Sequence, residues 1–148
     1  MHDRFYYGFI SGILAGIFPL IINLGSLLVN LTTLIWSDFM SVYIIGRTPE
    51  GMLETLFFIV VQFVFLGVVG ILFNFLLPHI LSERIALKGF VYGIVVWFVL
   101  FTMPTLLGIP KLEELPIKTA ITHLFSAGAW GIALALILNK INDKVSKL

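Results

Sequence analysis

Four long stretches without a charged side chain dominate this 148-residue chain. They cover residues 5–37, 55–82, 89–110 and 119–139. A helix that crosses about 30 Å of hydrocarbon needs about 20 apolar residues, and in lipid its backbone amides must bond within the helix. Each stretch therefore predicts a membrane-spanning helix, and the fold class is an all-α, integral membrane four-helix bundle. The expected spans are about 5–31, 52–77, 88–107 and 117–139.

Composition favours a single domain held in the membrane. Hydrophobic residues make up 59% of the chain and charged residues 11%, whereas a soluble domain carries about 25% charged residues. Too little chain lies outside the four stretches for an aqueous domain of about 50 residues. We therefore expect residues 1–148 to form one four-span transmembrane domain in contact with the lipid bilayer. Because the first apolar run is far longer than that of a signal peptide, it is expected to stay as a span.

The absence of several residue types and sequence motifs narrows the range of functions expected for this chain. The chain has no cysteine, which excludes disulfides, thiolate metal sites and cysteine nucleophiles. It has no GxSxG, HExxH, phosphate-loop or dinucleotide-binding pattern, so the sequence predicts no catalytic residue, no cofactor and no metal site. An enzyme is not expected. The net charge of +1 gives no reason to expect nucleic acid as a partner.

After the first span, residues 36–46 predict a short helix at the membrane interface. Ser37 or Asp38 can cap its start, its aromatic side chains suit the depth of lipid headgroups, and Gly46 can end it. Three further irregularities are expected: a kink at Pro19, a loop over residues 108–116 and a basic tail over residues 140–148.

Positive charges are unevenly divided between the two ends of the expected bundle. The end that holds both termini carries six lysines and arginines, and the opposite end carries three. The six are Arg4, Arg84, Lys88, Lys140, Lys144 and Lys147, and the three are Arg47, Lys111 and Lys118. Since short loops rich in Lys and Arg stay in the cytoplasm, both termini of this multi-pass protein are expected on the cytoplasmic side of the cell membrane.

Two pairs of short blocks recur in the same chain order. Residues 8–13 (GFISGI) match residues 89–94 (GFVYGI), and residues 67–71 (GVVGI) match residues 128–132 (GAWGI). This order predicts two helical hairpins of the same orientation, related by an axis along the membrane normal, which is a repeat type found in transporters. Chance is the alternative, because Gly and Ile are common in all spans.

Small residues recur every three or four positions where spans are expected to touch. In lipid, close backbone approach and dispersion contacts supply much of the energy of helix association. These residues predict packing within one chain, and the alternative is the seam of a homodimer or a contact with another membrane protein. The candidate packing residues are Gly8, Gly12, Gly16, Gly89, Gly93, Gly128 and Gly131.

One polar residue from each span falls in a common layer. Counted at about 1.5 Å per residue from the cytoplasmic ends, Asn23, Gln62, Thr102 and His123 lie at similar depths toward the outer rim. Polar residues inside a membrane are the default functional candidates. The layer is either a hydrated pocket that opens outward or a hydrogen-bond cluster that only fixes packing, and we favour the cluster because such residues commonly join spans.

The block at residues 89–97 (GFVYGIVVW), the Pro-rich loop that follows and the block at residues 128–131 resemble a known group. This group is the uncharacterised YqhR-like four-span membrane proteins of spore-forming Firmicutes. The resemblance covers most of the chain in span order and implies a bacterial cytoplasmic membrane, but it implies no activity. We expect a binding, scaffold or accessory bundle. The alternative is a compact transporter or channel with Gln62 and His123 in its polar layer.

The charge bias predicts where the carboxyl end lies. A reporter fused after the last residue, and functional only in the cytoplasm, should be active. The same position fused to a reporter that works only outside should be silent. Activity of the second reporter in place of the first would reverse the predicted orientation.

Overall fold

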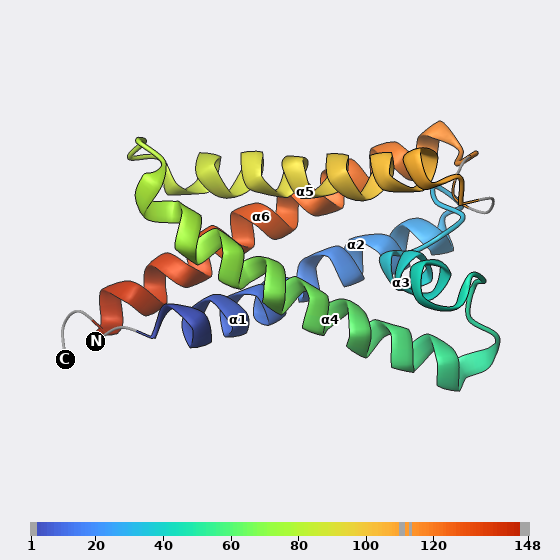
Figure 1. The fold of residues 1–148 in the computed structure, drawn as a ribbon, viewed down its shortest axis with the longest axis horizontal. Coiled ribbons are helices and arrows are strands. Elements are labelled where there is room, and N and C mark those ends of the chain that lie inside the picture. The colour runs from blue at the N-terminus through green and yellow to red at the C-terminus, as the bar shows by residue number, and fades with distance from the viewer. Residues whose placement is uncertain (1–2, 110–111, 113, 146–148) are drawn as a thin grey trace.

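A computed structural model describes residues 3–109, 112 and 114–145. The regular secondary structure in these ranges is helical with no strand, as predicted. The helices form an elongated bundle (Figure 1). In chain order the elements are α1 (Arg4–Ala15), α2 (Ile17–Leu28), α3 (Trp36–Ile45), α4 (Gly51–Leu76), the 3-10 turn η1 (Leu77–His79), α5 (Ile85–Leu107) and α6 (Ile117–Val145).

Four helical segments in the described part of the chain are long and apolar enough to cross a membrane. They are α1 with α2, α4 with η1, α5 and α6. The protein is therefore a multi-pass helical membrane protein. Helix α6 continues to Val145, past Asn139, where the fourth span is expected to end. Charged residues end the apolar stretch but do not end a helix, and lysines near a helix carboxyl end are favourable.

The α-helix of the first span is interrupted at Gly16, where α1 meets α2. Pro19 has no amide hydrogen, so the carbonyl of Ala15, four residues earlier, lacks its helical partner. The Gly16 amide donates to the carbonyls of both Gly12 and Ile13, at 3.1 and 2.9 Å, which tightens the turn. The irregularity near Pro19 is therefore an interruption of the helix at Gly16, three residues before the proline.

The two hairpins run in the same direction along the bundle. α1 and α2 lead to α4, α5 leads to α6, and both termini lie at one end with the turn between α4 and α5 (Figure 1). We call the opposite end of the bundle the distal end. From their shared turn, α4 and α5 diverge toward the distal end, where α3 packs against α4 (Figure 1).

Glycines of the repeated blocks make equivalent contacts in the two hairpins. A Cβ atom added to Gly12 would collide with the carbonyl oxygen of Leu66, and one added to Gly93 would collide with that of Ala127. Leu66 and Ala127 occupy matching places, each one residue before the second block of its repeat. The backbones of α1 and α4 therefore approach each other as closely as those of α5 and α6.

The neighbouring aromatic contacts repeat as well. The ring of Phe9 lies 2.6 Å from the place of a Cβ atom on Gly67, and the ring of Phe90 lies 2.8 Å from that place on Gly128. The repeat in the sequence is thus a repeat of packing between paired helices. The remaining candidate packing residues, Gly8, Gly16, Gly89 and Gly131, are also too crowded for an added Cβ atom.

Two side-chain hydrogen bonds join the hairpins near the middle of the bundle. The Trp130 indole on α6 donates to the Gly12 carbonyl on α1 at 3.3 Å, and the Tyr92 hydroxyl on α5 donates to the Val69 carbonyl on α4 at 2.7 Å. Tyr92 matches Ser11 in the repeat, and Trp130 matches Val69. The second hairpin thus carries larger side chains at positions 92 and 130 than the first carries at the matching positions 11 and 69.

We predict that Gly12→Ala lowers the free energy of unfolding by about 1–3 kcal/mol, because the methyl group meets rigid backbone rather than a flexible side chain. The measurement is thermal unfolding of the purified protein in detergent. Gly25→Ala is the matched control, since Gly25 lies in the same span with no atom within 4 Å of an added Cβ. Equal melting temperatures for the two variants would contradict the close packing of α1 on α4.

Candidate functional site

The polar residues Thr119, His123 and Ser126 lie on one face of α6, because residues four and seven positions apart are neighbours on a helix. All three are buried. The Thr33 amide donates to the Thr119 hydroxyl at 3.2 Å, and the Trp36 indole donates to the Ser126 hydroxyl at 2.9 Å. This face of α6 therefore holds the loop between α2 and α3 and the first residue of α3.

His123 lies between those two contacts and is enclosed by aromatic rings. The centroids of Trp36, Phe39 and Phe101 lie 4.6, 5.1 and 5.6 Å from that of the imidazole. His123 Nε2 lies 2.8 Å from the carbonyl oxygen of Leu34, which can only accept, so Nε2 carries the hydrogen. Nδ1 is buried and has no partner among the described residues. A neutral ring fits this cage, because a second N–H would have no acceptor there.

The carboxyl end of α3 is fastened to α5. Pro104 has no amide hydrogen, so the Leu100 carbonyl, four residues earlier, lacks its helical partner. The Tyr43 hydroxyl donates to that carbonyl. Burial raises the pKa of Tyr43 to about 12, so the hydroxyl keeps its hydrogen at neutral pH. The Leu100 carbonyl that Pro104 leaves unpaired in α5 thus provides the acceptor that positions α3.

The start of α3 differs from the expected cap. Ile35 occupies the cap position, and the Asp38 carboxylate accepts a hydrogen bond from the Ile35 amide at 2.8 Å. Asp38 therefore reaches back from the third helical position, and neither Ser37 nor Asp38 is the cap residue. Burial raises the pKa of Asp38, and the hydrogen bond from Ile35 partly offsets that rise. Gly46 ends the helix with φ 73°, as predicted.

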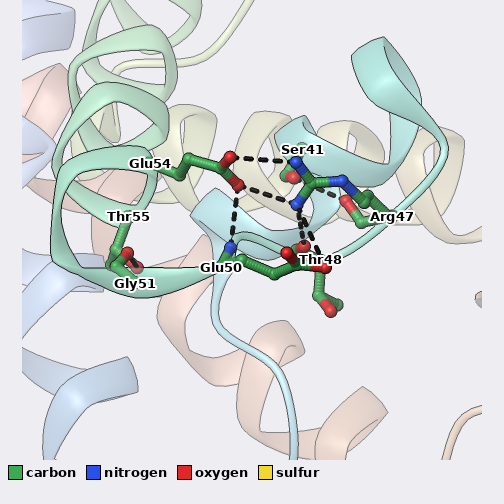
Figure 2. Close-up of polar contacts among 7 residues, drawn as sticks. All are labelled: Ser41, Arg47, Thr48, Glu50, Gly51, Glu54 and Thr55. Atoms are coloured by element: carbon green, nitrogen blue, oxygen red, sulfur yellow. Dashed lines mark hydrogen bonds and ion pairs between the residues drawn. The ribbon is translucent and has the colours of Figure 1, made fainter.

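An ion pair closes the loop between α3 and α4 (Figure 2). The Arg47 guanidinium makes two hydrogen bonds to the Glu54 carboxylate, at 2.8 and 2.9 Å, and Glu54 also accepts from the Glu50 amide at 2.8 Å. The Ser41 hydroxyl on α3 donates to the Arg47 carbonyl. Bidentate pairing fixes the relative orientation of the two side chains as well as their distance. The hydrogen bond to Glu54 raises the pKa of Arg47 above its usual value.

The four residues of the expected polar layer take separate roles. Asn23 is buried and donates to the Pro19 carbonyl of its own helix at 2.6 Å. Gln62 is buried, Thr102 is half-buried and His123 lies in the aromatic cage. No hydrogen bond joins any two of the four within the described ranges. The sequence missed the residues that His123 contacts, because they lie far away along the chain.

Gln62 lines a small cavity between the hairpins, beside α3. The cavity volume is about 20 Å³, which is room for about one water molecule. Its other walls are apolar apart from indole nitrogens, and the residues of α3 and α5 that line it are Trp36, Met40, Val96 and Leu100. The chain therefore places one amide against an otherwise hydrophobic cavity.

Comparison of the chain with protein-family models, with curated proteins and with solved structures finds no match. The class of protein is therefore defined by the fold alone. It is a multi-pass helical membrane protein in which a short helix is docked where α4 and α5 diverge.

We predict that Ser126→Ala lowers the free energy of unfolding by about 1–3 kcal/mol, because it leaves the buried Trp36 indole N–H without its acceptor. Thermal unfolding in detergent measures the effect. Thr122→Ala is the control, since among the described residues the Thr122 hydroxyl bonds only to the Lys118 carbonyl of its own helix, at 2.9 Å near the surface. If Ser126→Ala were as stable as Thr122→Ala, α6 would not hold α3 as described.

Proposed function

We propose that this protein is a binding or accessory bundle that acts on another membrane protein or on a second copy of itself. The observation that carries the proposal is the use of the buried polar face of α6. Thr119, His123 and Ser126 bond to residues 33–36 of the same chain. Polar side chains in the spans thus hold the fold together, which leaves the outer faces and the rims for recognition.

Helix α5 offers the largest uncovered face for such a partner. Only 11% of the most apolar 18 residues of α5 are buried, compared with 56% for α6. Exposed side chains on α5 include Val91, Val95 and Phe98. A neighbouring span could pack on this face without disturbing the contacts between α5 and α6.

The proposed location is a bacterial cytoplasmic membrane, with both termini in the cytoplasm. The excess of Lys and Arg at the end of the bundle that holds the termini supports this orientation. The resemblance of residues 89–97 to YqhR-like proteins supports the bacterial setting.

A compact transporter or channel is the second candidate, and one observation favours it. Gln62 faces a cavity between two parallel hairpins, and α3 covers that cavity through Trp36 and Met40. Glycines with positive φ, Gly46 at 73° and Gly51 at 81°, flank the loop that ties α3 to α4. In this candidate α3 is a plug, and its release would open the polar wall to water.

Cysteine labelling separates the two candidates, because the chain has no native cysteine. We expect Gln62→Cys and His123→Cys to stay unreacted with a membrane-impermeant maleimide in proteoliposomes. Glu114→Cys is the positive control, since Glu114 is exposed. Labelling at positions 62 and 123 as fast as at 114 would contradict the binding bundle and favour a hydrated pathway.

A second variant sharpens this experiment. Arg47→Gln breaks the ion pair to Glu54 and loosens the end of α3. In the binding bundle, Gln62→Cys remains unreactive when combined with Arg47→Gln, because the contacts of α6 still hold α3. In the transporter candidate, the combination speeds labelling at position 62.

A further inference from the structure

A groove between α2 and α6 lies on the surface near the distal end. Its volume is about 320 Å³, and it is separate from the cavity beside Gln62. Phe125 and Ile121 form part of its wall and are 71% and 46% exposed. In a protein surrounded by lipid, such a groove is filled by an apolar group from the membrane or from a partner.

The chemistry of the groove changes in order along α6. Lys118 lies in the first turn of the helix, and Thr122 and Phe125 follow about 6 and 10 Å deeper. α2 runs toward the same end and shows the same order, with Ser26 near its end and Ile22 about 6 Å deeper. From the rim inward, the groove therefore offers a cation at Lys118, then the hydroxyl groups of Ser26 and Thr122 at about the depth of Ile121, then apolar walls at Ile22 and Phe125. Leu31, which follows the end of α2, also lines the groove.

This order matches the parts of a phospholipid. A phosphate lies at the membrane surface, the glycerol esters follow, and the acyl chains lie deepest. The Lys118 side chain is exposed and makes no ion pair with any carboxylate in the described ranges, so its charge is available to a phosphate. The other described residues that line the groove are uncharged, so this set of residues carries a net positive charge.

We propose that this groove binds one anionic phospholipid, with the phosphate on Lys118 and an acyl chain against Ile22 and Phe125. Ser26 and Thr122 lie at the level of the ester oxygens, to which their hydroxyls can donate. The proposal does not depend on the proposed function, since a lipid held here serves a binding bundle and a transporter alike.

Native mass spectrometry of the detergent-purified protein tests the site by titration with phosphatidylglycerol or phosphatidylcholine. The wild-type protein should hold one phosphatidylglycerol more tightly than phosphatidylcholine. Lys118→Gln should weaken phosphatidylglycerol binding about five-fold, which is the effect of one lysine near an anionic headgroup. Lys118→Arg should keep the affinity, because it keeps the charge. Lys140→Gln, at the other end of the bundle, is the matched control and should change nothing.

A second variant tests the apolar part of the site. Thr122→Trp fills the groove and should weaken binding of both lipids, and since Thr122 lies near the surface the variant should still fold. Unchanged phosphatidylglycerol binding in Lys118→Gln would overturn the proposal, as would an equal loss in Lys140→Gln. Full binding in Thr122→Trp would also overturn it, because the anion would then sit on the rim without an acyl chain in the groove.

Discussion

The fold depends on how closely helix backbones can approach in an environment where burying a leucine gains little. Lipid tails are as apolar as the side chains, so two spans associate through dispersion contacts and close packing rather than through a hydrophobic drive. Gly12 brings α1 onto α4, and Gly93 brings α5 onto α6, each against a backbone carbonyl. These two seams make the hairpins rigid units, and Trp130 and Tyr92 then lock the units together by bonding across them.

The same environment explains the distal end. Where α4 and α5 diverge, unpaired backbone and polar groups would be costly in hydrocarbon, because each such group costs several kcal/mol. α3 packs there and supplies partners: Tyr43 for the Leu100 carbonyl freed by Pro104, and Trp36 for Ser126. The loop before α3 supplies hydrogen-bond partners for Thr119 and His123 in the same way. The polar residues of α6 and the short helix therefore form one structural unit.

Much of this architecture follows from the sequence because periodicity and charge are local signals. The uncharged stretches predicted the spans, and the glycine blocks predicted which pairs of helices form hairpins. The spacing of Thr119, His123 and Ser126 along a helix is enough to place them on one face. Their partners in residues 33–36 lie more than 80 positions away along the chain. Periodicity identifies the face of a helix but does not identify the residues that pack on it.

Helix α3 is a second case in which the sequence pattern predicted a segment without identifying its contacts. The sequence predicted its position and its end at Gly46, but an interfacial helix and a docked one share aromatic residues and a glycine stop. Phe39 is fully buried and Trp36 is 7% exposed, so α3 packs into the bundle. The pairing of Arg47 with Glu54 was also missed, because a helix amino end is a favourable place for a lone carboxylate.

Hydrogen–deuterium exchange of the protein in lipid nanodiscs tests the docking of α3 most directly. If α6 and α5 hold α3 as described, amides of residues 39–45 should exchange as slowly as those in the middle of α4, and far more slowly than those of the loop at residues 46–50. Exchange of residues 39–45 at the rate of that loop, while the spans remain protected, would show that α3 lies free of the bundle.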